Sequence, residues 1–355
     1  MLQTFSATDH TIYFGDVFDE LNNFLKEKKF SSVFILSDNN EVKLCLPFVL
    51  EKCPALKNAV LIEVKAGEEN KNLETCQLIW KKLLEQGADR NALLVTVGGG
   101  VISDTGGFCA ATFKRGISFI SIPTTLLSQA DASIGGKTGV DFYSSKNQVG
   151  AFNNPLAIFS YPGFIKTLPE VQIRSGFSEI LKQALIGDEN FFHRLQGIEN
   201  IYTANWEGIM PTAIQLKLKV VVADPFEKGP RKILNFGHTI GHAIESYFLE
   251  NNKPITHGEA VAAGMIAETY LSVTKKLLDE KSANSIYGVI KKHFIKLPIT
   301  KNDMPAIMEF VKLDKKNQNK TVKAVLLDAI GKPHIDVPLN ESELKDGLLY
   351  YINNG

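Results

Sequence analysis

Side chains able to bind a metal stand in three separate stretches of the chain: Glu179, His238 and His257. His242 follows His238 by four residues, so on a helix the two imidazoles share one face. His257 begins an Ala-rich stretch typical of another helix. Two or three neutral imidazoles and one carboxylate suit Zn²⁺ with one coordination position left open. The spacing alone is also compatible with an ordinary histidine pair, and it does not decide which imidazoles bind metal.

The sequence excludes one familiar zinc site, the metalloprotease helix, which requires His-Glu-x-x-His. Thr239 stands where that motif needs glutamate. Upstream, Glu179 and Lys182 occupy positions i and i+3 of a helix that we expect to open near Ser175. This spacing predicts an acid and a base close together on one helix face.

Basic side chains occur in the same motifs as the histidines, namely Lys182, Lys217, Arg231, Lys315 and Lys316. The formal net charge of the whole chain is +0, so no global field attracts nucleic acid or an anionic membrane. Local clustering of cations in a neutral chain instead predicts a small substrate with several negative charges.

The size and composition of the chain are those of a globular enzyme. Its 355 residues are enough for two domains with a sizeable core. No apolar run approaches the roughly 18 residues that span a bilayer, and the first residues lack a signal-peptide pattern. The four cysteines form no Cys-x-x-Cys pair and are expected to be reduced. We therefore expect a cytoplasmic protein without a membrane or nucleic-acid partner.

The elements that must position these groups differ between the two halves of the chain. Short apolar runs at 32–37, 59–64, 93–97 and 117–122, separated by helical stretches, indicate buried parallel strands. After Pro169, apolar residues recur at helical spacing instead. We predict an α/β Rossmann-like nucleotide-binding domain over 1–165 and an all-α metal- and substrate-binding domain over 166–355.

A glycine turn follows the third predicted strand. Gly99 and Gly100 would let the backbone approach a diphosphate, and the next helix start offers free N–H groups. The turn is not the Gly-x-Gly-x-x-Gly fingerprint, and a tight turn without a ligand is the alternative. Glu68 and Lys71, after the second strand, could face the ribose.

A lysine flanked by glycine follows the fourth predicted strand. Gly135-Gly136-Lys137-Thr138 resembles the end of a P-loop, but the glycine four residues earlier is missing, so that interpretation is rejected. Lys137 can still hold an anionic group as a point charge.

Taken together, these motifs resemble those of the 3-dehydroquinate synthase family, within the sugar-phosphate cyclases. The matching stretches are 67–71, 98–104, 123–141, 146–147, 167–169, 179–182, 217–231, 235–245, 257–265 and 314–316. The resemblance implies an NAD-binding domain, a helical domain and an active site in the cleft between them. The implied reaction converts 3-deoxy-D-arabino-heptulosonate 7-phosphate to 3-dehydroquinate and phosphate. It proceeds by transient NAD-dependent oxidation, phosphate elimination, reduction and intramolecular aldol closure.

The resemblance also implies roles for individual residues. The implied ligands of Zn²⁺, with Co²⁺ as an alternative metal, are Glu179, His238 and His257, so that His242 faces the substrate. The implied catalytic residues are Asp131, Lys137, Lys182, Asn235 and His242. The implied substrate contacts are Asn147, Lys217, Arg231, one of Lys315 and Lys316, and Arg115 from the second subunit of a homodimer. The implied cofactor contacts are Asp38, Glu68, Lys71, Gly99, Gly100, Asp104, Thr124, Thr125, Lys137, Lys146 and Thr167.

One departure from the family pattern and three alternative functions stay open. The loop at 224–230 contains two prolines that stiffen it, so its approach to a substrate can differ. The alternatives are a cyclase forming 2-epi-5-epi-valiolone or 2-deoxy-scyllo-inosose, an NAD-dependent polyol dehydrogenase such as glycerol dehydrogenase, and a silent binding protein. Arg231, Asn235 and His242 favour a substrate with both a phosphate and a carboxylate. A dehydrogenase would release NADH, whereas the cyclase would not.

Overall fold

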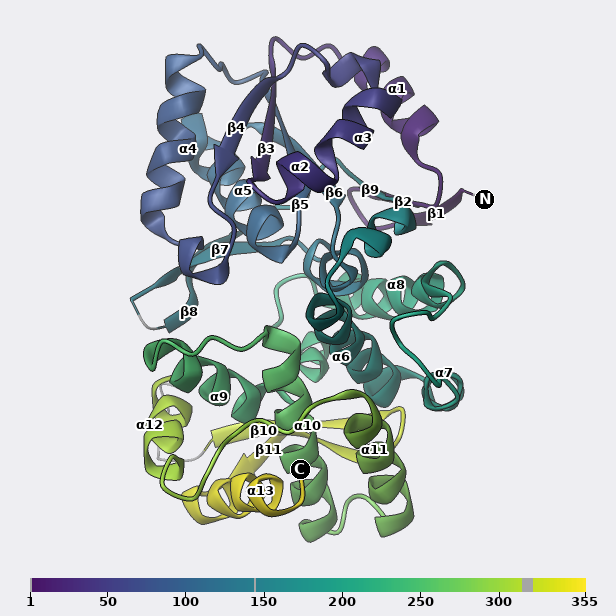
Figure 1. Cartoon of the computed structure of the whole chain (residues 1–355), viewed down its shortest axis with the longest axis vertical. Helices are drawn as coiled ribbons and strands as arrows, with labels where there is room; N and C mark the ends of the chain where they lie inside the picture. The colour runs from purple at the N-terminus through teal and green to yellow at the C-terminus, as the bar shows by residue number, and fades with distance from the viewer. Residues whose placement is uncertain (1, 144, 315–321) are drawn as a thin grey trace. The chain divides into compact units, whose positions relative to one another are not determined.

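The computed structural model describes residues 2–143, 145–314 and 322–355 (Figure 1). The chain divides into two compact units, the first formed by Met1–Pro169 and Asn205–Pro225 and the second by Glu170–Ala204 and Phe226–Gly355. The sequence-based prediction had a single division between residues 165 and 166. The contacts instead assign the later segment 205–225 to the first unit.

The first unit contains a seven-stranded sheet in its described residues, ordered β1-β2-β9-β6-β5-β3-β4. Only β1 and β2 pair antiparallel within it, and the remaining neighbours pair parallel. Its strands are β1 (Gln3–Ser6), β2 (Thr11–Phe14), β3 (Val33–Asp38), β4 (Val60–Val64), β5 (Leu93–Gly98), β6 (Ser118–Pro123) and β9 (Ala157–Ser160). The four parallel strands predicted from apolar runs are therefore confirmed as β3 to β6.

Helices cover both faces of this sheet because its strands are apolar on both sides (Figure 1). Phe34 and Leu36 pack into one buried cluster with α4 and α5, whereas Ile35 packs into another with α1 and α3. This alternation follows from the two-residue period of a strand. The helices of this unit are α1 (Phe18–Glu27), α2 (Glu41–Leu44), α3 (Leu46–Lys52), η1 (Pro54–Leu56), η2 (Glu68–Asn70), α4 (Leu73–Glu85), α5 (Gly100–Thr112), η3 (Phe113–Arg115), η4 (Ser128–Ala132), η5 (Pro162–Thr167) and α8 (Trp206–Ala223).

A β-hairpin that the sequence did not predict completes the first unit. It is formed by β7 (Lys137–Phe142) and β8 (Ser145–Phe152), which pair antiparallel. Gly139 and Gly150 face each other across it, and a side chain at either position would meet the opposite backbone. The hairpin packs on α5 and carries Lys137, Lys146 and Asn147.

The second unit is built mainly of helices, as the sequence predicts. They are α6 (Glu170–Gly187), α7 (Glu189–Gln196), η6 (Pro230–Asn235), α9 (His238–Glu250), α10 (His257–Thr274), α11 (Glu280–His293), α12 (Met304–Asp314) and α13 (Glu341–Asn354). The description of this unit as all-α is wrong in one respect, because β10 (Val322–Ala329) and β11 (Lys332–Leu339) form an antiparallel pair. Helix α10 is central, since α6, α9, α11 and α13 all pack on it.

Two further expectations can be compared with the structure. Helix α6 begins at Glu170, five residues before the predicted start near Ser175. All four cysteines are unpaired and buried, as predicted. No helix within the described ranges is both long and apolar enough to cross a bilayer.

Candidate functional site

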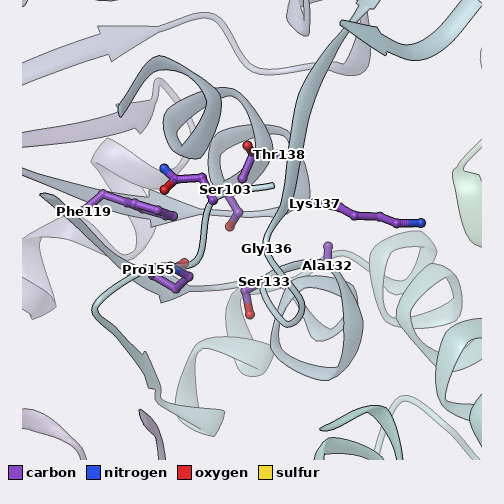
Figure 2. Close-up of a pocket in the computed structure, with 10 residues that line it drawn as sticks. Ser103, Phe119, Ala132, Ser133, Gly136, Lys137, Thr138 and Pro155 are labelled. Atoms are coloured by element: carbon purple, nitrogen blue, oxygen red, sulfur yellow. The ribbon is translucent and has the colours of Figure 1, made fainter. Parts of the chain in front are cut away.

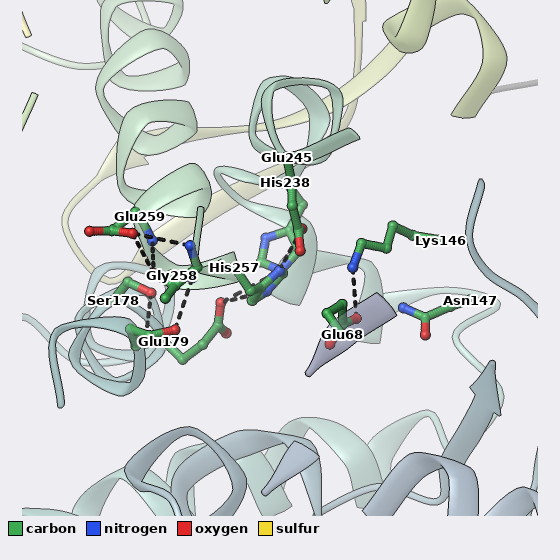
Figure 3. Close-up of polar contacts among 12 residues, drawn as sticks. Glu68, Lys146, Asn147, Ser178, Glu179, His238, Glu245, His257, Gly258 and Glu259 are labelled. Carbon is green, nitrogen blue, oxygen red and sulfur yellow. Dashed lines mark hydrogen bonds and ion pairs between the residues drawn. The ribbon is translucent and has the colours of Figure 1, made fainter. Parts of the chain in front are cut away.

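Three candidate metal ligands and one further imidazole lie together in the second unit. The imidazoles of His238, His242 and His257 each offer a ring nitrogen within 4.8 Å of the others. Oε1 of Glu179 lies 3.6 Å from Nε2 of His238 and 3.5 Å from Nε2 of His257 (Figure 3). The structure thus brings together the three ligands predicted from sequence, with His242 as a fourth group beside them.

Close packing of three helices produces this convergence. Glu179 stands on α6, His238 and His242 on α9, and His257 is the first residue of α10. A side chain at Gly264 of α10 would collide with the carbonyl oxygen of Gly237, and one at Gly258 would collide with the backbone of Ser175. A hydrogen bond holds the second of these contacts, since Gly258 N donates to Ser175 Oγ at 3.1 Å.

An ion pair joins α6 and α10 beside that contact. The Arg174 guanidinium donates to Glu259 Oε1 at 3.0 Å through Nη2 and at 3.3 Å through Nε. The other carboxylate oxygen of Glu259 accepts from the Thr256 backbone at 3.1 Å, within the capping box that begins α10. Glu259 therefore both caps the N-terminus of α10 and links this helix to α6.

The far nitrogens of two imidazoles are held by fixed partners. His238 Nδ1 lies 3.0 Å from the carbonyl oxygen of Phe236, and His257 Nδ1 lies 3.0 Å from Glu245 Oε2 (Figure 3). Partners of this kind orient metal-binding imidazoles and leave Nε2 for the ion. In both rings Nε2 is the atom nearest Glu179.

Glu179 is a buried carboxylate in a cationic environment. It is 1% exposed, it forms an ion pair with Lys182 Nζ, and its Oε1 faces Nε2 of His238 and of His257. Burial raises its pKa, but the charges of Lys182 and His257 outweigh this effect and lower the pKa to about 2. An ionised, buried carboxylate that faces two imidazole nitrogens fits a divalent cation.

The pKa values of the two imidazoles nearest Glu179 are shifted in opposite directions. Burial, followed by the charges of Lys182, His242 and His257, lowers the pKa of His238 well below its ordinary value. Burial also acts to lower the pKa of His257, but attraction by Glu245 and hydrogen bonding to Glu179 raise it to about 10. His238 is therefore neutral and able to bind a cation at neutral pH, whereas His257 must lose a proton first.

Two residues predicted to contact the substrate belong to the η6 region of the second unit. Arg231 is 2% exposed. The Asn235 amide donates to Glu227 Oε1 at 2.6 Å, and Glu227 has a left-handed backbone with φ of 54°. Glu227 lies between the two prolines that distinguish this loop from the family pattern. Its contact with Asn235 was not predicted from the sequence.

The glycine turn of the first unit has the predicted form. Gly98 ends β5, Gly99 precedes α5, and Gly100 is the first residue of that helix. A Cβ on Gly99 would lie 2.9 Å from Cγ2 of Thr125, so this position accepts no larger residue without a shift. Thr124 is fully buried, and its backbone N–H donates to the Gly98 carbonyl at 3.0 Å. The free N–H groups at this helix start can receive a phosphate.

Five polar residues of the first unit form one network. Lys71 Nζ donates to Asp104 Oδ2 and to Asn147 Oδ1, both at 2.7 Å. Lys146 Nζ donates to Glu68 Oε1 at 2.7 Å (Figure 3). Burial lowers the pKa of Lys71, but attraction by Asp104 and Glu68 outweighs it and raises the pKa. The structure therefore joins four predicted cofactor contacts with Asn147, which was predicted to contact the substrate.

The remaining predicted residues of the first unit lie in several places. Lys217 of α8 donates to Asp131 Oδ1 of η4 at 2.8 Å. Asp38 ends β3 and accepts hydrogen bonds from the backbone N–H groups of Asn40 and Glu41. Lys137 on β7 and Arg115 are exposed, and Thr167 Oγ1 lies 3.6 Å from Cys45 Sγ. Lys315 and Lys316 lie outside the described residues.

A small cavity adjoins the start of α5 but cannot be the cofactor site. It is lined by serines 103, 121 and 133, among others, and has a volume of about 10 Å³, which is room for one water molecule. Figure 2 shows the Lys137 side chain pointing away from it.

A parallel α/β unit with a glycine turn and a helical unit with a Glu-His cluster fit the fold of solved synthases that bind NAD⁺ and a divalent metal ion. The solved structure of 2-deoxy-scyllo-inosose synthase complexed with carbaglucose-6-phosphate, NAD⁺ and Co²⁺ matches this chain with a TM-score of 0.89 at 25% identity, covering 100% of each chain. Residues 61–175 match the 3-dehydroquinate synthase N-terminal family model, and residues 176–317 match the C-terminal model. The chain belongs to the 3-dehydroquinate synthase family.

Two relatives in this family match nearly the whole chain. The 3-dehydroquinate synthase of Parabacteroides distasonis is 41% identical over 336 residues, which cover 94% of each protein. That of Clostridium beijerinckii is 37% identical over 326 residues, covering 89% of this chain and 90% of the relative. The family suggested by the motifs is therefore confirmed.

Proposed function

We infer that this chain is an enzyme that converts 3-deoxy-D-arabino-heptulosonate 7-phosphate to 3-dehydroquinate and phosphate. The reaction is a carbon–oxygen lyase step of the shikimate pathway, which leads to aromatic amino acids. The observation that carries this inference is the 41% identity to a 3-dehydroquinate synthase over 94% of the chain. The Glu179–histidine cluster supports it, because it provides the metal ligands that such an enzyme needs.

The cofactors of this enzyme are NAD and a divalent metal ion, Zn²⁺ or Co²⁺. NAD fits the glycine turn at Gly99 and the polar network around Lys71 in the first unit. Glu179, His238 and His257 would hold the ion, since the Glu179 carboxylate and the two Nε2 atoms that face it form a suitable donor set. When bound, the ion supplies Lewis acidity and the nicotinamide reversible hydride acceptance.

The protein side chains then bind, orient and neutralise an anionic substrate. A phosphate and a carboxylate carry about three negative charges near neutral pH, and buried cations are needed to receive them. Arg231 suits the planar carboxylate because its guanidinium can bond both oxygens, whereas Lys182 acts as a point charge. Asn235 and His242 can donate to substrate oxygens. These side chains orient the substrate and neutralise its charge, so the proposed reaction requires no protein nucleophile.

In the first unit, Asp131, Lys137, Asn147 and Lys217 are assigned to the substrate by the same reasoning. The Lys217–Asp131 pair keeps a buried ammonium in one orientation, which favours its use as a fixed donor. Arg115 is exposed, and the resemblance assigns it to the active site of the second subunit of a homodimer. We propose a cytoplasmic location, which the pathway and the unpaired, buried cysteines support.

The test is turnover with defined substrates. Purified protein with NAD⁺ and Zn²⁺ should release phosphate from the heptulosonate phosphate while absorbance at the NADH band stays flat. Stoichiometric accumulation of NADH would instead indicate a polyol dehydrogenase. A preference for a carboxylate-free hexose phosphate would assign the chain to the other sugar-phosphate cyclases, whose fold it shares.

A further inference from the structure

Helix α9, which carries His238, begins without a capping side chain of its own. Its N-cap is Gly237, in the left-handed conformation with φ of 79°, and glycine offers no side-chain acceptor. Other helices of the second unit are capped locally, as Asp279 caps α11 through the backbone of Ser282. The first turn of α9 therefore needs acceptors for its N–H groups from elsewhere.

Glu268 of α10 supplies two of these acceptors. Its Oε2 accepts from Gly237 N at 2.6 Å, and its Oε1 accepts from Ile240 N at 3.2 Å. These are the N-cap and N3 positions, which a capping box normally satisfies with two side chains of the same helix. One carboxylate from a neighbouring helix performs both functions. Its negative charge also lies at the positive end of the α9 dipole.

This carboxylate is built into the core. Glu268 is 0% exposed, and a buried charge of this kind is retained only where it is bonded. Gly264, one turn earlier on α10, lets that helix approach the Gly237 carbonyl closely. His238 stands between the two anchored positions, so the orientation of its ring depends on the same turn.

We propose that Glu268 is a positioning residue of the metal site, which sets the direction of His238 by holding the first turn of α9. Helix α10 then contributes twice, with the candidate ligand His257 at its first residue and Glu268 eleven residues later, about three turns along the helix. The proposal rests on the assignment of His238 as a metal ligand. It assigns to Glu268 no contact with metal or substrate.

The test compares Glu268→Gln with Glu343→Gln. Glu343 belongs to the capping box of α13 in the same unit, where its Oε2 accepts from Asn340 N at 2.8 Å. Both substitutions weaken the capping of one helix, but only the first affects the turn that carries His238. Metal-free wild type and variants are titrated with Zn²⁺ against a chromophoric chelator, and Co²⁺-loaded samples are compared by visible absorption.

Glu268→Gln should weaken Zn²⁺ binding by about 10-fold or more, the usual effect of losing an outer partner of a metal ligand, and should shift the Co²⁺ bands. Glu343→Gln should change neither. Unchanged affinity and spectrum in Glu268→Gln would overturn the proposal. If that variant does not fold, Glu268→Asp decides in the same assays, since its shorter carboxylate cannot reach both N–H groups. Failure of wild type to bind Zn²⁺, or undiminished binding in His238→Ala, would instead reject the underlying metal site.

Discussion

His257 Nδ1 lies 3.0 Å from Oε2 of Glu245, a carboxylate on the preceding helix α9 that is itself largely buried. Glu245 keeps the proton of the ring on Nδ1 and so leaves Nε2 directed towards Glu179. Glu245→Gln should therefore weaken Zn²⁺ binding by about 10- to 100-fold. A chelator competition assay measures this, with Glu250→Gln, an exposed change on the same helix, as the control. Equal affinities in both variants would show that Glu245 does not orient the ring.

Removal of a candidate ligand should abolish metal binding and turnover together. His257→Ala leaves Glu179 and His238 with too few donors for a stable site. Metal content after dialysis, determined by mass spectrometry, and phosphate release give the two readouts. His193→Ala, at an exposed position of α7, should keep both. Stoichiometric zinc with full activity in His257→Ala would reject His257 as a ligand.

A substitution in the glycine turn should weaken NAD⁺ binding but leave the stability of the protein almost unchanged. Gly99→Ala places a Cβ 2.9 Å from Cγ2 of Thr125, so the turn must shift away from the geometry that receives the diphosphate. We expect weaker NAD⁺ binding by calorimetry with little change in thermal unfolding. Gly288→Ala, inside α11 with open space around it, is the control and should stabilise the protein by about 0.5–1 kcal/mol. Unaltered NAD⁺ affinity in Gly99→Ala would place the diphosphate elsewhere.

Arg231 should distinguish substrates by their carboxylate. Arg231→Lys keeps the positive charge but loses the bidentate hydrogen-bond donor. The kcat/KM should therefore fall strongly for the heptulosonate phosphate and little for a carboxylate-free sugar phosphate. Arg194→Lys, at an exposed position, should affect neither. The same loss for both substrates would mean that Arg231 supports its loop instead of reading the carboxylate.

Acid should weaken the second unit through Asp303. Hydrogen bonds from the Tyr247 hydroxyl, at 2.5 Å, and from Thr300 lower the pKa of Asp303 below 3.8. Because the folded pKa is depressed, this stabilisation is present above pH 3.8 and is lost as the pH falls through the folded value. Asp303→Asn should therefore be less stable than wild type at pH 6, by no more than about 1 kcal/mol since the group is only partly buried and screened by solvent, with a smaller difference below pH 3.8.

Thermal unfolding followed by circular dichroism between pH 6 and pH 2.5 measures this difference. Asp346→Asn, at an exposed position, controls for the general loss of an acid. A stability gap between wild type and Asp303→Asn that stays constant over this range would contradict the assignment.

The sequence was sufficient for those parts of the structure that depend on local pattern. The apolar runs predicted β3 to β6 because buried parallel strands need apolar residues on both faces. The candidate ligand set of Glu179, His238 and His257 came from the family resemblance, because spacing alone did not decide which imidazoles would bind metal. Spacing could not reveal which α9 or α10 residues support these ligands, because that depends on how the two helices pack.

Glu268 is the clearest residue that sequence reasoning missed. A glutamate within a helix is normally expected at the surface, because charged side chains are rarely fully buried. Only the approach of α10 to the Gly237 turn places this one in the core. The Lys71–Asp104–Asn147 network could not be predicted from the sequence either. Asp104 and Asn147 lie 33 and 76 residues after Lys71, so no local pattern connects them.

The assignment of α8 to the first unit has a consequence for how this protein is made. The sheet and its covering helices are complete by residue 169, but the unit they belong to also needs residues 205–225. Residues 170–204 of the second unit are therefore synthesised before α8, the last helix of the first unit. Helix α6, which lies within 170–204, packs on α10 of the second unit. Its packing partner is therefore synthesised only later, as part of residues 226–355. A gene divided after residue 165 would accordingly express two incomplete folding units.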